Sequence, residues 1–295
     1  MPSNRTSRVL PILSLLLGAT LWGLFWYPLR WLEAQGLPGM WSSLLIYITV
    51  TVVSLPLLWR RRGEVVQEPW LLAALALTAG VCNVAFILAV IEGNVVRVLL
   101  LFYLSPLWAS LLGWWLLGER LSSRAGLTLA LAMAGAVIML WDPALGWPWP
   151  QGRADGLAIV AGFTFALSNV CVRKMQAVSY PVKSIAVWWG GVVTAGAGLL
   201  LMPMPMPMPM IDAPLLGAIV ALACGGMVVM TLAVQYGVTL MPVHRSAVIL
   251  LFEIVVGAVS AQLLTDEILL LREWLGGLLI MAAAYLSARA VRDID

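Results

Sequence analysis

The sequence VVRVLLLFYLSPLWASLLGWWLL occupies residues 95–117, and Arg97 is the one charged side chain in it. An α-helix needs about 20 mostly apolar residues to cross the hydrocarbon core of a bilayer, so this run predicts a membrane span. The whole chain contains ten such runs, and the fold class expected is an all-α polytopic membrane protein. The expected spans are residues 9–31, 38–58, 69–92, 95–117, 122–141, 155–176, 181–201, 213–236, 243–264 and 269–290.

The composition agrees with burial in a membrane. The 295 residues are 62% hydrophobic and 11% charged, whereas a soluble domain is about one quarter charged. A net charge of +3 gives no support for nucleic-acid binding. The cysteines Cys82, Cys171 and Cys224 lie inside apolar runs, without the spacing of a metal site. We therefore expect no nucleic-acid partner, no metal and no cofactor.

The basic residues indicate how the chain is oriented. If the N-terminus is cytoplasmic, that side of the membrane receives 13 of the 17 Lys and Arg residues. Short cytoplasmic loops carry such an excess of basic residues in membrane proteins. We therefore expect a multi-pass protein of a bacterial-type inner membrane, with the lipid bilayer around it and both termini in the cytoplasm.

The ten expected spans divide into two similar halves. At a constant offset of 144, residues 18–22 align with 162–166 and residues 89–93 with 233–237. After a shift of four residues, Arg97 aligns with Arg245 and Glu119 with Glu267. Five is an odd number of spans, so the second half enters the membrane from the opposite side and the repeat is inverted. The expected domains are a first five-helix repeat at 1–141, an extracytoplasmic connector at 142–154, and a second repeat at 155–295.

Several of these features resemble a known family. The sequences ATLWG at residues 19–23, YLSP at 103–106 and GER at 118–120 resemble the EamA-type drug/metabolite transporter (DMT) superfamily, and the resemblance covers the whole chain. With 15 Trp residues and the stretch LFYLSPLWASLL at 101–112, the chain is most similar to the YddG-type branch, which exports aromatic and other amino acids. The resemblance implies helices around a central cavity, with the fifth and tenth set aside, often at a dimer contact. The second half departs from the pattern, because Ile254 stands opposite Pro106 and Glu253 opposite Ser105.

Glu253 is the first candidate for a functional residue. It is the only carboxylate well inside an expected span, eight residues beyond Arg245, which is about 12 Å along a helix. An ionisable group at such depth normally faces a bundle interior or an aqueous cavity. Three readings remain open for Glu253: a proton-coupling carboxylate, a ligand for a substrate ammonium group, or a structural hydrogen-bond partner.

Other residues inside the spans could bind a substrate. Polar groups within a membrane either bind ligands or hold helices together. Deep aromatic rings could form the wall of a cavity, attract a cation or simply pack. The additional candidates for substrate binding are Trp22, Asn83, Tyr103, Trp108, Trp188 and Gln235.

Arg97 and Arg245 begin equivalent spans on opposite sides of the membrane. Each could act as a gate by pairing with Glu92 or another acid when its side closes, or could simply set the topology as an interfacial cation. We take Arg245, Glu92 and Glu253 as the candidate gating or coupling residues.

The sequence favours a secondary transporter that exports small amphipathic metabolites, amino acids above all, by alternating access. The alternatives are an exporter of hydrophobic drugs or nucleosides, and a membrane receptor that moves no solute. The chain has no GxxxxGK[ST] motif for ATP. Its single histidine and the lack of an HExxH motif argue against a membrane-embedded enzyme. We expect the protein to work as a monomer or a homodimer on a small-molecule substrate.

Overall fold

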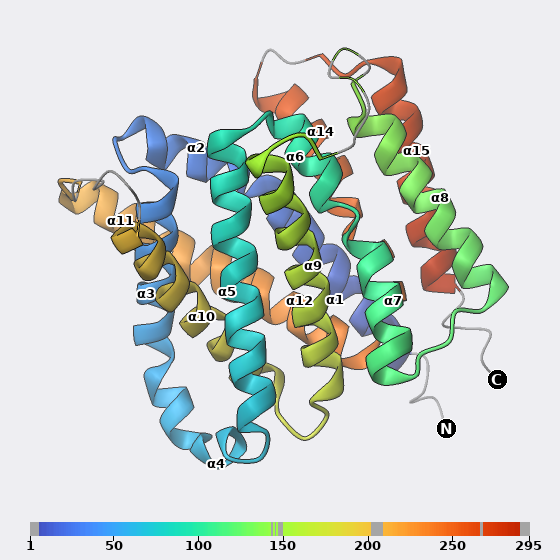
Figure 1. Ribbon diagram of the computed structural model, residues 1–295. Coiled ribbons are helices and arrows are strands. Elements are labelled where there is room, and N and C mark those ends of the chain that lie inside the picture. Colours follow the sequence, from blue (N-terminus) through green and yellow to red (C-terminus); the bar gives the residue numbers. More distant parts are fainter. Residues whose placement is uncertain are drawn as a thin grey trace.

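The computed structural model describes residues 6–142, 144, 146, 150–201, 209–265 and 268–289, and the regular elements within them are all helices (Figure 1). Glu267, parts of the connector at 142–154 and most of the Met/Pro run at 202–210 lie outside these residues. The elements are α1 (Thr6–Leu24), α2 (Trp26–Ala34), α3 (Gly39–Arg60), α4 (Arg62–Val65), α5 (Pro69–Glu92), α6 (Val95–Phe102), α7 (Ser105–Leu117), α8 (Ser123–Leu140), α9 (Arg153–Lys174), α10 (Tyr180–Leu201), α11 (Ala213–Ala221), the π-helical segment η2 (Leu222–Met227), α12 (Val228–Leu240), α13 (Val243–Leu250), α14 (Phe252–Leu264) and α15 (Leu271–Arg289).

The predicted spans agree with these helices to within a few residues. In the described part of the chain, nine single helices or runs of consecutive helices are long and apolar enough to cross a membrane. The eighth runs to Leu240 rather than ending at residue 236, because residues 237–240 contain neither charge nor proline. The tenth predicted span is α15. It is not apolar enough to count among the nine, and Arg272 and Glu273 lie in its first turn. The fold class is confirmed, but the exact count of ten is not.

Helix α1 begins and helix α15 ends at the same end of the helical bundle (Figure 1). The short helix α4 is at this end as well, while α2 lies at the other. We call these the termini end and the opposite end. That the termini end faces the cytoplasm remains a prediction.

The helices pack as two halves that interlock. Helix α5 packs against α9 of the other half, and its counterpart α12 packs against α1. In the same way α7 packs against α9 and α14 against α1, while α8 lies along α15. Each half therefore buries its apolar surface mainly against the other half, as expected for a two-repeat fold.

The offset between aligned residues of the two halves changes by four, and the helix boundaries show where this occurs. Helix α5 begins at Pro69 and its counterpart α11 at Ala213, an offset of 144, whereas the same spans end at Glu92 and Leu240, an offset of 148. The offset of 144 still holds at residues 233–237, beyond the π-helical segment η2, so the four extra residues follow residue 237, at the end of α12.

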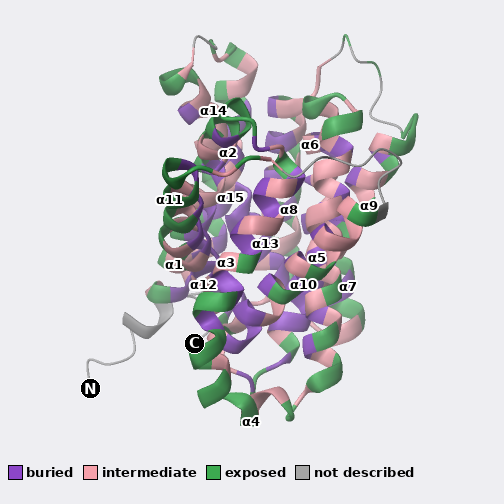
Figure 2. Ribbon diagram, turned by 90° about the vertical axis from the view of Figure 1, so that its left-hand side faces the viewer, coloured by how far each residue is buried: buried purple, intermediate pink, exposed green. Residues whose placement is uncertain are grey.

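Buried residues line the inside of the bundle, and exposed residues cover its outer surface and its ends (Figure 2). Large apolar side chains are among those on the outside, for example Leu127 at 71% and Leu263 at 77% exposure. An apolar outer surface is favourable in contact with lipid and unfavourable in contact with water.

Candidate functional site

Two spans, one in each half, are broken at equivalent positions. Helix α6 ends at Phe102 and α7 begins at Ser105, with Pro106 in the first turn of α7. Since proline has no backbone N–H, the carbonyl of Phe102 has no helical partner there. Helix α13 gives way to α14 at Leu251, although Ile254 replaces the proline. Broken helices expose backbone polar groups and, in transporters, commonly surround the substrate site.

Helices of the opposite half approach both breaks closely. A Cβ added at Gly162 of α9 would lie 2.6 Å from the carbonyl oxygen of Phe102, and one added at Gly23 of α1 would lie 2.7 Å from that of Glu253. Only glycine permits helix backbones to come so near to each other. The two breaks are thereby held inside the bundle.

Glu253 lies in the first turn of α14, directly after the second break. The hydroxyl of Tyr103, at the first break, donates a hydrogen bond of 3.2 Å to its Oε1. Within the described residues no Lys, Arg or His nitrogen lies within 4.0 Å of this carboxylate. Cys82 of α5 is close enough for an electrostatic interaction with it. The two broken spans thus join through a carboxylate that has no basic partner, a pairing that the sequence did not predict.

Phenylalanine rings gather beside this pair. The ring of Phe102 lies 5.2 Å from Tyr103, 5.0 Å from Phe86 of α5 and 5.7 Å from Phe165 of α9, centroid to centroid. Phe86, Phe102 and Phe165 are each partly exposed. The sequence analysis missed these three because single Phe residues are ordinary in apolar helices, and the only signal was that Phe102 precedes Tyr103.

Two of the predicted aromatic residues pack in the core. Trp22 lies 5.8 Å from Phe25, between two apolar clusters. Trp188 is 3% exposed and donates a hydrogen bond of 3.3 Å to Thr231 Oγ1. These contacts match the packing alternative, and a cavity-lining role for either residue stays a prediction.

The other predicted binding residues are distributed over several helices. Asn83 accepts a hydrogen bond of 2.8 Å from Ser43 and donates one of 3.4 Å to Tyr47, so it joins α5 to α3. Trp108 lies 5.6 Å from Phe163, and its buried indole N–H has no partner in the described residues. Gln235 is 6% exposed, and within the same residues its side-chain oxygen accepts no hydrogen bond. None of their contacts links these residues to Glu253.

The candidate gating residues lie at the two ends of the bundle. At the opposite end Arg97 pairs with Asp155 at 2.8 Å, and Glu92 pairs with Arg153 at 3.6 Å, so Glu92 is not the acid that Arg97 meets. At the termini end Arg245 forms no ion pair with any described residue.

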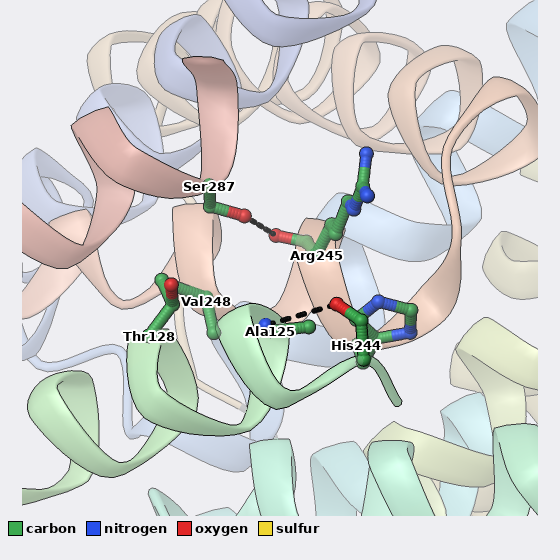
Figure 3. Close-up of a pocket in the computed structure, with 7 residues that line it drawn as sticks. Ala125, Thr128, His244, Arg245, Val248 and Ser287 are labelled. Atoms are coloured by element: carbon green, nitrogen blue, oxygen red, sulfur yellow. Dashed lines mark hydrogen bonds between the residues drawn. The ribbon is translucent and has the colours of Figure 1, made fainter. Parts of the chain in front are cut away.

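Arg245 adjoins a small pocket between α8, α13 and α15 (Figure 3). The Ser287 hydroxyl donates to the backbone carbonyl of Arg245, and the Arg245 guanidinium points away from Thr128 and His244. The pocket's volume of about 20 Å³ leaves room for about one water molecule. It is therefore too small for a metabolite. Its lining residues are Ser122, Ala125, Thr128, His244, Arg245, Val248 and Ser287.

Comparison with known families agrees with this architecture. The EamA-like transporter family matches the chain twice, at residues 9–141 and 152–289. The chain belongs to the EamA-like transporter family. The two matched segments cover both halves of this EamA-like chain, including both broken spans and Glu253.

Individual relatives are more distant. The chain is 28% identical over 177 residues to an uncharacterized transporter, PA0485, of Pseudomonas aeruginosa, a match that covers 57% of this chain and 56% of the relative. It is 27% identical over 216 residues to the chloramphenicol-sensitive protein RarD of the same organism, which covers 68% of this chain and 67% of RarD. The chain thus matches little more than half the length of the first relative. One solved crystal structure superposes with a TM-score of 0.77 over 99% of this chain and 100% of its own, and its 18% identity supports the fold alone.

The buried apolar residues of this EamA-like fold form several clusters. One apolar cluster at the termini end joins six helices, through Leu15 of α1, Leu75 of α5, Val172 of α9, Val182 of α10, Val238 of α12 and Ile249 of α13. A separate cluster joins α7, α9 and α13. Towards the opposite end one cluster joins α2, α3, α10, α11, η2 and α12, and another joins α5, α6 and α9.

Proposed function

We propose that this EamA-like protein is a secondary transporter that exports aromatic and other amino acids by alternating access across a bacterial-type inner membrane. The observation that carries the proposal is the Glu253 carboxylate, which lies at a helix break and has no basic partner in the described residues. It accepts a hydrogen bond from Tyr103, whose ring adjoins a group of phenylalanine rings. In this proposal both termini are cytoplasmic.

The chemistry of the site matches an amino acid in two respects. A carboxylate inside a bilayer is costly unless a cation or a proton compensates it. The ammonium group of an amino acid can provide that compensation, with a further attraction from the faces of nearby aromatic rings. An apolar or aromatic substrate side chain can pack against Phe86, Phe102 and Phe165, whose rings remain partly exposed.

The interlocked inverted halves support transport rather than binding alone. A pseudo-twofold axis in the membrane plane allows two conformations of similar energy, each open to one side. A receptor would need the binding site but not this symmetry.

One observation favours a second candidate function. The relative RarD is described as chloramphenicol-sensitive, so a drug-sized neutral aromatic molecule is the alternative substrate. A neutral molecule would use the phenylalanine rings but would leave the charge of Glu253 uncompensated. Dependence on Glu253 therefore separates the two candidates.

The test is counterflow in liposomes that contain the purified protein. Labelled phenylalanine, tryptophan, methionine and threonine are compared with chloramphenicol and a nucleoside. Three variants are measured beside the unchanged protein: Glu253→Gln, Tyr103→Phe, and Glu33→Gln as an exposed carboxylate control.

We expect exchange of amino acids in the unchanged protein and in Glu33→Gln. Loss of a charged hydrogen-bond partner within a membrane should reduce exchange by Glu253→Gln at least roughly tenfold, with a smaller decrease for Tyr103→Phe. Exchange of chloramphenicol alone, unaffected by Glu253→Gln, would establish the second candidate. Binding of amino acids without any exchange would mean a receptor.

A further inference from the structure

A lysine is completely buried at the termini end. Lys183, near the start of α10, is 0% exposed. Its ammonium group donates to the backbone oxygen of Val172 at 2.8 Å and to Thr239 Oγ1 at 3.0 Å. No carboxylate of the described residues lies within 4.0 Å of it. A buried ammonium with only neutral partners is expensive, so its position requires an explanation.

The partners of Lys183 identify what it does. Val172 and Thr239 lie in the last turns of α9 and α12. The carbonyl groups at a helix C-terminus carry partial negative charge, which favours a cation placed there. Lys183 thus ties the ends of two spans together and partly balances the cost of its own burial.

Arg173 and Glu119 extend this tie to both halves. Arg173 donates to the backbone oxygen of Thr239 at 2.8 Å and to Glu119 Oε1 at 3.1 Å. The other oxygen of Glu119 accepts the backbone N–H of Val243 at 2.8 Å, at the start of α13. We name Glu119, Arg173, Lys183 and Thr239 the termini-end network. It connects the ends of α7, α9, α10, α12 and α13.

The first half does not carry the two basic residues of this network at the equivalent positions. At the repeat offset of 144, Leu29 corresponds to Arg173 and Gly39 to Lys183. Residues 34–59 contain no charged side chain at all. The packing differs in the same way: α9 packs against α12, whereas the equivalent pairing of α1 and α2 with α5 involves no more than isolated contacts among the described residues.

We propose that the termini-end network is the gate that closes the transport pathway on the side of the chain ends. When the site opens to that side, α9 must separate from α12, and the bonds of Lys183 and of the Arg173–Glu119 pair must break. The Lys183 ammonium then gains water in place of its protein partners. Hydration in the open state offsets the lost bonds, which keeps the two states close in energy.

This inference depends on the proposed transport function but not on its substrate. The native Cys82, which lies near Glu253, provides a probe of the central site. In a chain with Cys171→Ala and Cys224→Ala, Cys82 is the one cysteine that remains of three. The measurement is the rate at which a membrane-impermeant thiol reagent modifies Cys82 in sealed vesicles, applied separately to each side. Protease cleavage of a C-terminal tag shows which side the termini face.

The variants are Lys183→Ala, which removes the tie between α9 and α12, and Glu119→Gln, which weakens the link to Arg173 and Val243. The matched control is Lys174→Ala, because Lys174 is an exposed lysine at the end of α9. A hydrogen bond to a charged group contributes enough that its loss should raise the rate from the termini side roughly tenfold. Lys174→Ala should leave the rate unchanged.

The gate is supported if Lys183→Ala and Glu119→Gln raise modification from the termini side while the rate from the other side stays the same or decreases. If the rate of Cys82 modification rises equally from both sides, the substitutions loosen the helix packing as a whole, and the proposal is overturned. An unchanged rate from the termini side in both variants would overturn it as well, whatever the rate from the other side. A positive result without amino-acid counterflow would reject the proposed substrate while the gate stands.

Discussion

The crossing of α5 and α10 allows a stability prediction that needs no substrate. At this crossing a Cβ added to Gly190 would overlap the carbonyl oxygen of Ala76 and would lie 2.6 Å from its carbonyl carbon and 2.9 Å from its Cα. Six residues further along α10, a Cβ added to Gly196 would meet only Leu44 Cδ1, at 3.9 Å. Gly190→Ala and Gly196→Ala therefore form a matched pair on one helix.

The expected difference follows from these distances. Carbon atoms in contact prefer a separation of about 3.5–4.0 Å, so Gly190→Ala must push the two backbones apart by roughly 1 Å. Overpacking of this kind costs about 1–3 kcal/mol. Both variants gain the same helix propensity, about 1 kcal/mol for alanine over glycine. The difference between them isolates the clash, and Gly190→Ala should be less stable than Gly196→Ala by about 1–3 kcal/mol.

Thermal unfolding of the two purified variants in the same detergent measures this difference. One kcal/mol corresponds to roughly 2–4 °C in the unfolding midpoint for chains of 150–250 residues. The midpoint of Gly190→Ala should therefore lie several degrees below that of Gly196→Ala. Equal midpoints would refute the close approach of α5 and α10 at this position.

Three further predictions concern charge and the site. Burial alone would raise the pKa of Glu64, but hydrogen bonds of 2.8 Å from the Ser179 N–H and 2.9 Å from Arg61 lower it. A carboxyl group whose pKa is lower in the folded than in the unfolded protein stabilises the fold at pH values above its unfolded pKa of about 4.3. This stabilisation is lost as the pH falls through the folded pKa. Glu64→Gln should thus lower the thermal midpoint at pH 7 but not at low pH, and a deficit that persists there would contradict the reasoning. Asp155→Asn removes the carboxylate charge from a pair whose side chains are 10% and 9% exposed, so it should cost about 1.5–3 kcal/mol, the contribution of a charged hydrogen bond. By contrast Glu92→Gln, in a pair whose side chains are 73% and 31% exposed, should cost less than about 1 kcal/mol. Similar thermal midpoints for the two variants would contradict the conclusion that the Arg97–Asp155 pair is the more buried of the two. Phe102→Ala should reduce counterflow of phenylalanine and tryptophan more than that of threonine, whereas Phe163→Ala should reduce none selectively, and equal reduction of all substrates by Phe102→Ala would indicate a packing role.

The membrane spans were predictable because the signal for them is local. Each span needs its own run of apolar residues, and charges or prolines mark its ends, as at Arg60 and Pro69. The exception, α15, has a charged first turn and depends on its packing along α8. The break at Tyr103 could be read from Pro106, but the break at Leu251 could not, because no residue there forbids a helix.

The site was predictable only in part, because its contacts join residues far apart in the chain. Tyr103 and Glu253 each stood out as polar groups deep in apolar runs, but their hydrogen bond spans 150 positions. Lys183 gave no signal either, since a lysine near a span end is normally hydrated, and only the fold shows it buried. Glu119 was recognised as one member of a repeated pair, but its bonds to Arg173 and Val243 depend on how the halves meet.

The differences between the two halves are more informative about function than their similarities. A perfect inverted repeat would make the two ends of the pathway equivalent, with no preference for either direction. In this chain the second half has Glu253 where the first has Ser105, and it has Lys183 where the first has Gly39. The first of these differences provides a carboxylate at the centre, and the second provides the buried lysine of the termini-end network. In the proposed alternating-access cycle the two states are similar in energy, so a few hydrogen bonds at one end would be enough to set which state predominates. The residues that break the symmetry are therefore the ones whose substitution should change the balance between the two states, and those that preserve it should affect both states alike.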